Sequence, residues 1–226
     1  MLSVWAQEEM ATANLNDKRL DDRLTQVLSD LGDHCSASIP AACGGHAEMT
    51  AAYRFFDNDK VTWQGILEPH YEQTRRRISA QDVVLLVQDT TEVDVTRPQE
   101  QMVGAGPMDG SARFGAFLHL LEAFTPDGTP LGVASCDLWT RDKPTQSMSA
   151  KEKRRRRKAA PIEEKESHRW LEGLRQAREV AQASPHVTCV CVGDSEADIL
   201  LRHIMNEHIE NAAPSPEASR ASTVFR

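Results

Sequence analysis

The amino-acid sequence predicts an α+β protein, with an all-α bundle at the N-terminus and a region of strands and helices after it. Two observations carry this prediction. Up to about residue 70, apolar residues recur at offsets of three and four, which is the period of amphipathic helices. Beyond residue 80 the period changes, and short apolar runs bounded by turn signals follow one another, with helical segments among them. The order of these later segments is β-β-β-α-β-α.

The N-terminal bundle, residues 1–75, is expected to contain four or five helices. Its clearest helix lies in "DKRLDDRLTQVLSDLGDH", and Gly32 is expected to end it. Five apolar residues of this segment fall on one face: Leu20, Leu24, Val27, Leu28 and Leu31. Another helix is expected from about His46, with three aromatic residues as core anchors: Tyr53, Phe55 and Phe56.

The mixed region, residues 76–210, is expected to contain four strands. A buried strand covers residues 82–88, and "PDG" marks the turn of a hairpin formed by residues 114–124 and 130–139. A long helix over residues 161–183 leads to the apolar strand "HVTCVCVGD" and a last helix. Residues 211–226 are rich in Ala, Ser and Pro without any period, which predicts a disordered tail.

Composition narrows the class of protein. Of the 226 residues, 40% are hydrophobic and 27% are charged, as in soluble globular proteins, and no apolar stretch is long enough to span a membrane. No signal peptide is recognisable, and the five cysteines, odd in number and without zinc spacing, indicate a reducing cytosol. Two of them, Cys189 and Cys191 in "CVC", lie on one face of a strand, which favours a role as small buried groups. The net charge of −8 argues against nonspecific coating of nucleic acid, although "KEKRRRRK" at 151–158 is strongly basic. This run is either a solvated loop or a DNA contact.

Two aspartates stand just after apolar strands. Asp89 follows the first strand of the mixed region, and Asp194 follows the fourth. In this order of elements the two strands lie side by side and parallel, so the carboxylates meet at one edge of the sheet. A hard divalent cation such as Mg²⁺ relieves their repulsion. The alternative is that each Asp caps the turn or helix after it, and "GDSEADI" suits a helix N-cap. A phosphatase of the haloacid-dehalogenase type would need a second Asp at position 91, where this chain has Thr.

Four segments, in this order and spacing, resemble the DDE cut-and-paste transposases of bacterial insertion sequences, most closely the Tn-five-like branch. They are "SIPAACGGHAEMTAAYRFFDNDKV", "VQDTTEVD", "EEKESHRW" and "GDSEADI". The resemblance covers residues 5 to about 205. It implies a helical DNA-binding domain followed by a ribonuclease-H-like catalytic domain, here incomplete, and double-stranded DNA of the transposon terminal repeats as the partner.

The resemblance also implies roles for individual residues. Asp89 and Asp194 would be the first two acids of the metal-binding triad, with Mg²⁺ as the cofactor and Mn²⁺ as its substitute. Seven arginines are candidates for DNA contact: Arg19, Arg23, Arg54, Arg154, Arg155, Arg156 and Arg157. Arg19 and Arg23 are four residues apart on one helix and so share a face, which suits phosphate contact. Near Asp21 and Asp22 they could equally be ordinary surface arginines.

The sequence departs from this family in one important respect. In the family, the third acid of the triad is a Glu on a helix that also carries Tyr, Arg and Lys. No such residues surround the glutamates that follow Asp194 in this chain, which are Glu196, Glu207, Glu210 and Glu217. The C-terminal dimerisation helices of the family, which acts as a dimer, are also missing. We therefore expect a truncated or frameshifted copy of a cut-and-paste transposase without the catalytic Glu. The alternative is a non-catalytic DNA-binding remnant or regulator of transposition.

Overall fold

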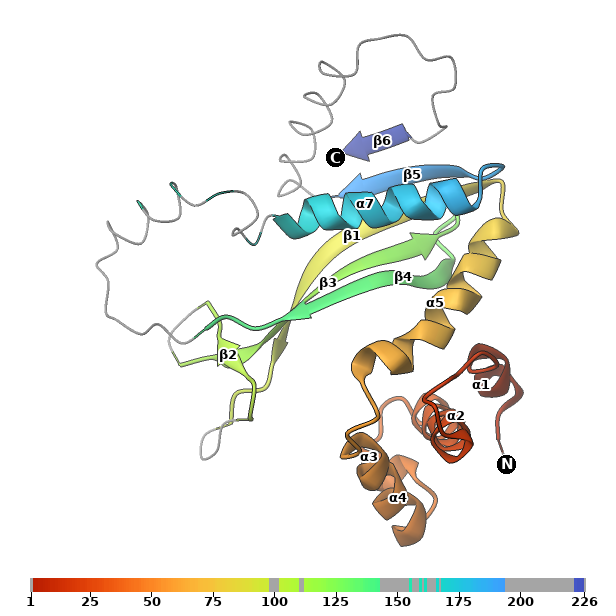
Figure 1. Ribbon diagram of the computed structural model, residues 1–226, viewed down its shortest axis with the longest axis vertical. Coiled ribbons are helices and arrows are strands. Elements are labelled where there is room, and N and C mark those ends of the chain that lie inside the picture. Colours follow the sequence, from red (N-terminus) through yellow and green to blue (C-terminus); the bar gives the residue numbers. More distant parts are fainter. Residues whose placement is uncertain are drawn as a thin grey trace. The chain divides into compact units, whose positions relative to one another are not determined.

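The computed structural model describes residues 2–97, 102–109, 112–142, 168–193 and 222–225, together with the single residues 155, 159, 161 and 166. The chain divides into two compact units, residues 1–76 and residues 77–226 (Figure 1). Helices come first and a mixed sheet follows, so the predicted α+β class is confirmed.

Helices are the only regular secondary structure among the described residues of the first unit. In chain order the helices are α1 (Val4–Glu9), α2 (Lys18–Asp33), α3 (Ile39–Ala42), α4 (His46–Phe56) and α5 (Trp63–Ser79), whose last turn belongs to the second unit. Their apolar faces close on one core, and its buried members are Met10, Leu15, Leu24, Val27, Cys43, Ala52 and Phe55. The core residues of α2, and those of α4, are three apart, the spacing that places side chains on one face of a helix.

Both ends of α2 have a clear chemical cause. The helix begins after Asp17, whose carboxylate accepts a hydrogen bond from the backbone nitrogen of Arg19 at 3.0 Å. It continues through Gly32 to Asp33, so the prediction that Gly32 ends it is wrong. Glycine fits position 32 because a Cβ there would lie 2.4 Å from the indole of Trp5, which packs on the helix backbone. The indole Nε1 donates to Asp33 Oδ1 at 3.2 Å.

The second unit is built on one mixed sheet with the strand order β2-β3-β1-β5-β6, and β4 also pairs with β3. The strands are β1 (Val83–Asp94), β2 (Gly106–Pro107), β3 (Phe114–Phe124), β4 (Pro130–Trp139), β5 (Thr188–Gly193) and β6 (Ser222–Phe225). The predicted hairpin is confirmed, because β3 and β4 pair antiparallel. The predicted neighbours β1 and β5 do pair in parallel.

Three features of the sheet differ from the sequence prediction. β1 continues to Asp94 because its second half pairs antiparallel with the first half of β3, from Asp89 opposite Leu120 to Asp94 opposite Gly115. Residues 91–94 are exposed and carry no apolar alternation, so sequence gave no sign of them. The described residues also form six strands rather than four, because β2 and β6 were not expected. β6 pairs with β5 and falls within the range that the sequence predicts as a disordered tail.

Helix α7 (His168–Ala183) covers one face of the sheet and contacts β1, β3, β4 and β5 (Figure 1). Pro161 and Glu166 lie outside it, so this helix begins later than predicted. Alternate residues of the strands are buried under α7, as the period of a strand requires. Cys189 and Cys191 are both buried on this face, which confirms their predicted role as small core residues.

Candidate functional site

Asp89 lies inside β1, so the prediction that the strand ends at residue 88, just before Asp89, is wrong. It stands two residues beyond the last parallel pair of β1 and β5, Val87 with Val192. Its side chain is exposed, and its Oδ1 accepts a hydrogen bond from the backbone nitrogen of Thr90 at 2.7 Å. The second predicted ligand, Asp194, lies outside the described residues. The expectation that the Asp89 and Asp194 carboxylates lie close together therefore stays a prediction.

A buried polar network lies beside Asp89. Gln88 is 1% exposed and His119 is 4% exposed. The Oε1 atom of Gln88 is 3.3 Å from His119 Nε2, and the Nε2 atom of Gln88 donates to Cys191 Sγ at 3.2 Å. The other imidazole nitrogen, Nδ1, is 2.8 Å from Thr90 Oγ1. The sequence analysis did not predict this network. Its one signal was His119, the only histidine in the apolar strand "FGAFLHLLEAF", because a histidine in a buried strand needs polar partners.

The network is closed by α7. A Cβ at Gly173 would lie 2.2 Å from Gln88 Oε1 and 3.2 Å from His119 Nε2, so only glycine leaves room for the amide and the imidazole. The imidazole meets the Trp170 indole edge to face, with ring centroids 4.9 Å apart. Burial lowers the pKa of His119, against the opposing attraction of the Asp137 and Asp89 carboxylates. The neutral imidazole is thus favoured.

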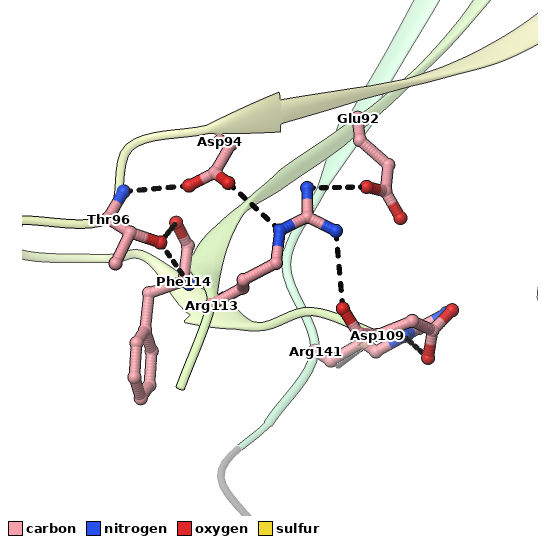
Figure 2. A network of polar contacts seen from close by, with 7 residues as sticks. All are labelled: Glu92, Asp94, Thr96, Asp109, Arg113, Phe114 and Arg141. Atoms are coloured by element: carbon pink, nitrogen blue, oxygen red, sulfur yellow. Dashed lines mark hydrogen bonds and ion pairs between the residues drawn. The ribbon is translucent and has the colours of Figure 1, made fainter. Parts of the chain in front are cut away.

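Beyond Asp89, charged residues hold the second half of β1 against the start of β3 (Figure 2). Arg113 donates to Glu92 Oε2 at 2.8 Å and to Asp94 Oδ2 at 2.9 Å. Hydrogen bonds from Thr96, and next from Arg113, lower the pKa of Asp94 to about 2. Arg113 also donates to the backbone oxygen of Asp109 at 3.2 Å. These contacts stabilise the part of β1 that has no apolar burial.

Helix α4 of the first unit presents an exposed face with aromatic and basic side chains. Phe55 is 2% exposed and belongs to the core, as predicted. Tyr53 is 48% exposed and Phe56 is 45% exposed, so their predicted role as core anchors is wrong. The buried residues of α4, Ala52 and Phe55, are three apart and share one face of the helix, and Tyr53 and Phe56 lie outside that face. Arg54, in the last turn, is exposed as well.

The three N-terminal arginine candidates differ in their partners. Arg19 pairs with Asp17, from Nε to Oδ1 at 3.1 Å and from Nη2 to Oδ2 at 2.8 Å. The side-chain hydrogen bond from Arg19 lowers the pKa of Asp17 to about 2. Arg23 is half-buried on α2, and Arg54 is exposed on α4. Neither has a carboxylate within ion-pair distance among the described residues. Of the four arginines at 154–157, only Arg155 is described, and it is exposed.

Residues 3–61 match the family model of transposase DNA-binding domains. This match covers α1 to α4, including the exposed face of α4 and all three N-terminal arginine candidates. It supports a transposase N-terminus and DNA as the partner. In the matched residues 3–61, ten acidic residues stand against five basic ones. Binding to DNA phosphates must therefore use a local basic face rather than the overall charge.

Two further properties concern the described residues only. None of their helices combines the length and the apolar character needed to cross a membrane. Their His, Cys, Asp and Glu side chains form no group of three placed to hold a metal ion. The exposed carboxylate of Asp89 is the type of oxygen ligand that hard cations take, and its Oδ1 accepts a hydrogen bond from the backbone nitrogen of Thr90.

Proposed function

We propose that this protein is a DNA transposase whose first unit binds the terminal repeats of an insertion sequence. The observation that carries the proposal is the match of residues 3–61 to transposase DNA-binding domains. The exposed face of α4 supports it, because Tyr53 and Arg54 offer an aromatic ring and a cation side by side in sequence on a helix, with neither needed by the core. Such a helix can enter a groove or lie along the phosphates.

The three N-terminal arginines differ in whether a carboxylate already binds the guanidinium group that would contact DNA. Arg54 and Arg23 have no competing carboxylate among the described residues, so a DNA phosphate would be their first strong anionic partner. Arg19 must exchange the carboxylate of Asp17 for a phosphate, which offsets much of the gain. We therefore assign Arg54 the larger contribution to affinity and Arg19 the smaller one.

We further propose that the second unit has a ribonuclease-H-like fold of the DDE type. The register supports a shared site for Asp89 and Asp194. Each β1 residue from Val83 to Val87 pairs with the β5 residue numbered 105 higher, and the same offset relates Asp89 to Asp194. Between them the two carboxylates would hold a divalent cation, Mg²⁺ or Mn²⁺, which when bound stabilises charge on the oxygens around phosphorus. Asp89 supplies one negative ligand from a strand that is held on both sides.

A second candidate function is that of a DNA-binding regulator of transposition without cleavage. It is favoured by the match of residues 3–61, because that match concerns DNA binding alone. Both candidates require binding to transposon ends. A transposase cuts these ends once its three acids are assembled, whereas a regulator never does. End-specific cleavage by this chain would therefore exclude the regulator.

The experiment for DNA binding compares two charge-removing variants of the full chain. Duplexes of the inverted repeats that flank the coding sequence serve as the probe, and affinity is measured over a range of salt concentrations. Arg54→Ala should weaken binding and lower the salt slope by about 1, as expected for the loss of one phosphate contact. Arg75→Ala on α5 is the control, because Arg75 already pairs with Glu68 and Glu72. Equal effects of the two variants would contradict the assignment of α4.

A further inference from the structure

We propose that His119 is a positioning residue for Asp89, because one imidazole contacts both residues that flank Asp89 in β1. Gln88 and Thr90 each have a polar atom within hydrogen-bond distance of the ring, at 3.3 Å and 2.8 Å. This inference rests on the proposed metal site at Asp89. In this inference His119 orients the Asp89 carboxylate and does not itself contact the cation.

The alternation of side chains along β1 explains how this contact reaches Asp89. Gln88 and Thr90 are two apart and therefore face the same side of the sheet, the side covered by α7. Asp89 lies between them and faces the opposite side, where its carboxylate is exposed. His119 stands directly opposite Thr90 in the antiparallel register. Holding both flanking side chains fixes the backbone at position 89 and so the direction of its Cα–Cβ bond.

The directions of the hydrogen bonds are consistent with one tautomer of His119. Gln88 Oε1 can only accept, so His119 Nε2 must carry the proton. In a neutral imidazole Nδ1 then accepts, and the Thr90 hydroxyl donates to it. The Gln88 amide in turn donates to Cys191 Sγ. Each of these groups thus has a partner. The hydrogen bonds run in one direction, from Thr90 on β1 to His119 on β3, back to Gln88 on β1 and on to Cys191 on β5.

The surroundings leave this arrangement little freedom. Gly173 has no side chain, and the space is taken by the Gln88 amide and the imidazole ring. Trp170 closes the other side of the ring. On the exposed side of β1, the backbone nitrogen of Thr90 donates to Asp89 Oδ1 at 2.7 Å. Thr90 therefore links the buried network to the carboxylate by two bonds, one from its hydroxyl and one from its backbone.

A polar network of this kind could instead serve the stability of the core alone. The two roles differ in what they predict for Thr90, whose hydroxyl is only half-buried. A structural role predicts a change in thermal stability and no change in the affinity of a cation at Asp89. A positioning role predicts a change in cation affinity that returns when the hydroxyl is restored.

The experiment is a calorimetric titration of the full chain with Mn²⁺, with thermal unfolding of the metal-free protein measured in parallel. Thr90→Val keeps the shape of the side chain and removes the hydroxyl, and Thr90→Ser keeps the hydroxyl. Loss of a group that orients a ligand typically weakens metal affinity by about tenfold or more, so we expect this for Thr90→Val and about the wild-type affinity for Thr90→Ser. His119→Asn, which keeps an acceptor near the position of Nδ1 but cannot reach Gln88, should also bind Mn²⁺ more weakly.

Asp89→Asn separates this inference from the proposed metal site. If Asp89→Asn abolishes Mn²⁺ binding while folded Thr90→Val and His119→Asn bind like the wild type, the positioning role of His119 is overturned and the metal site stands. If the wild type does not bind Mn²⁺, or if binding survives Asp89→Asn, the metal site itself is wrong and the inference falls with it. Should His119→Asn fail to fold, the Thr90 pair alone decides between the two roles.

Discussion

Replacing Gly173 by Ala tests the packing of α7 on the polar network directly. Gly173 lies in the interior of a 16-residue helix, where glycine is normally unfavourable. Helix propensity alone therefore predicts that Gly173→Ala stabilises the protein by up to about 1 kcal/mol. The structure predicts the opposite sign. The new Cβ would lie 2.2 Å from Gln88 Oε1, and both Gln88 and His119 are buried.

The size of the effect follows from what must move. Overpacking a close-packed interior costs about 1–3 kcal/mol. Displacing the Gln88 amide also breaks its contact with His119 Nε2, and a buried group left without a partner costs about 1–3 kcal/mol. After subtracting the gain in helix propensity, the net destabilisation is about 3 kcal/mol. For a unit of this size, that corresponds to a fall in Tm of about 6–12 °C.

Thermal unfolding followed by circular dichroism measures this shift, and Glu179→Ala is the matched control. Glu179 is exposed on the same helix, so its replacement should change the free energy of unfolding by no more than about 0.5 kcal/mol. In a Gln88→Ala background, Gly173→Ala should lower the free energy of unfolding by less than it does in the wild type. The reason is that the Gln88 amide, which the new methyl group would meet, is then absent. A Gly173→Ala protein as stable as the wild type, or more stable, would refute the close approach of α7 to Gln88.

Three further predictions concern other parts of the chain. Asp17→Ala should lower the denaturant midpoint of the first unit through loss of the α2 N-cap, measured by chemical denaturation, with the exposed Asp59→Ala as control. The lowered pKa of Asp94 means that its contribution to stability is present above about pH 4 and is lost as the pH falls towards about 2. The stability difference between wild type and Asp94→Asn should therefore shrink over that range, and a constant difference would count against the Arg113 and Thr96 contacts. Finally, these 226 residues should not nick transposon ends in Mn²⁺, and end-specific nicking that Asp89→Ala abolishes would show that the catalytic centre is complete.

Much of the fold could be predicted because its apolar patterns are strong. The offsets of three and four in α2, and the turn between β3 and β4, each reflect burial on one side of an element. The adjacency of β1 and β5 follows from the rules of chain connection. Gly32 misled the reading of α2, because sequence cannot distinguish a glycine that ends a helix from one that makes room for an indole.

The candidate site was harder to predict because polar contacts across strands have no short-range sequence signal. Asp89 stood out as a carboxylate after an apolar run, but the continuation of β1 depends on pairing with β3 and on Arg113, 19 residues beyond Asp94. Gln88 and His119 are 31 residues apart, so only the strand register brings them together. The exposure of Tyr53 likewise depends on how α4 packs against its neighbours.

The central claim is that the first unit recognises the ends of a transposon. It is tested most directly by fluorescence anisotropy of the full chain with two labelled duplexes at about 0.15 M salt, near the physiological ionic strength. One duplex carries the inverted repeats that flank the coding sequence, and the other is a scrambled duplex of the same length and composition. The account predicts that the repeat duplex binds more tightly, by on the order of a thousandfold, as specific protein–DNA complexes do. Equal affinity for the two duplexes, or no binding to either, would contradict it.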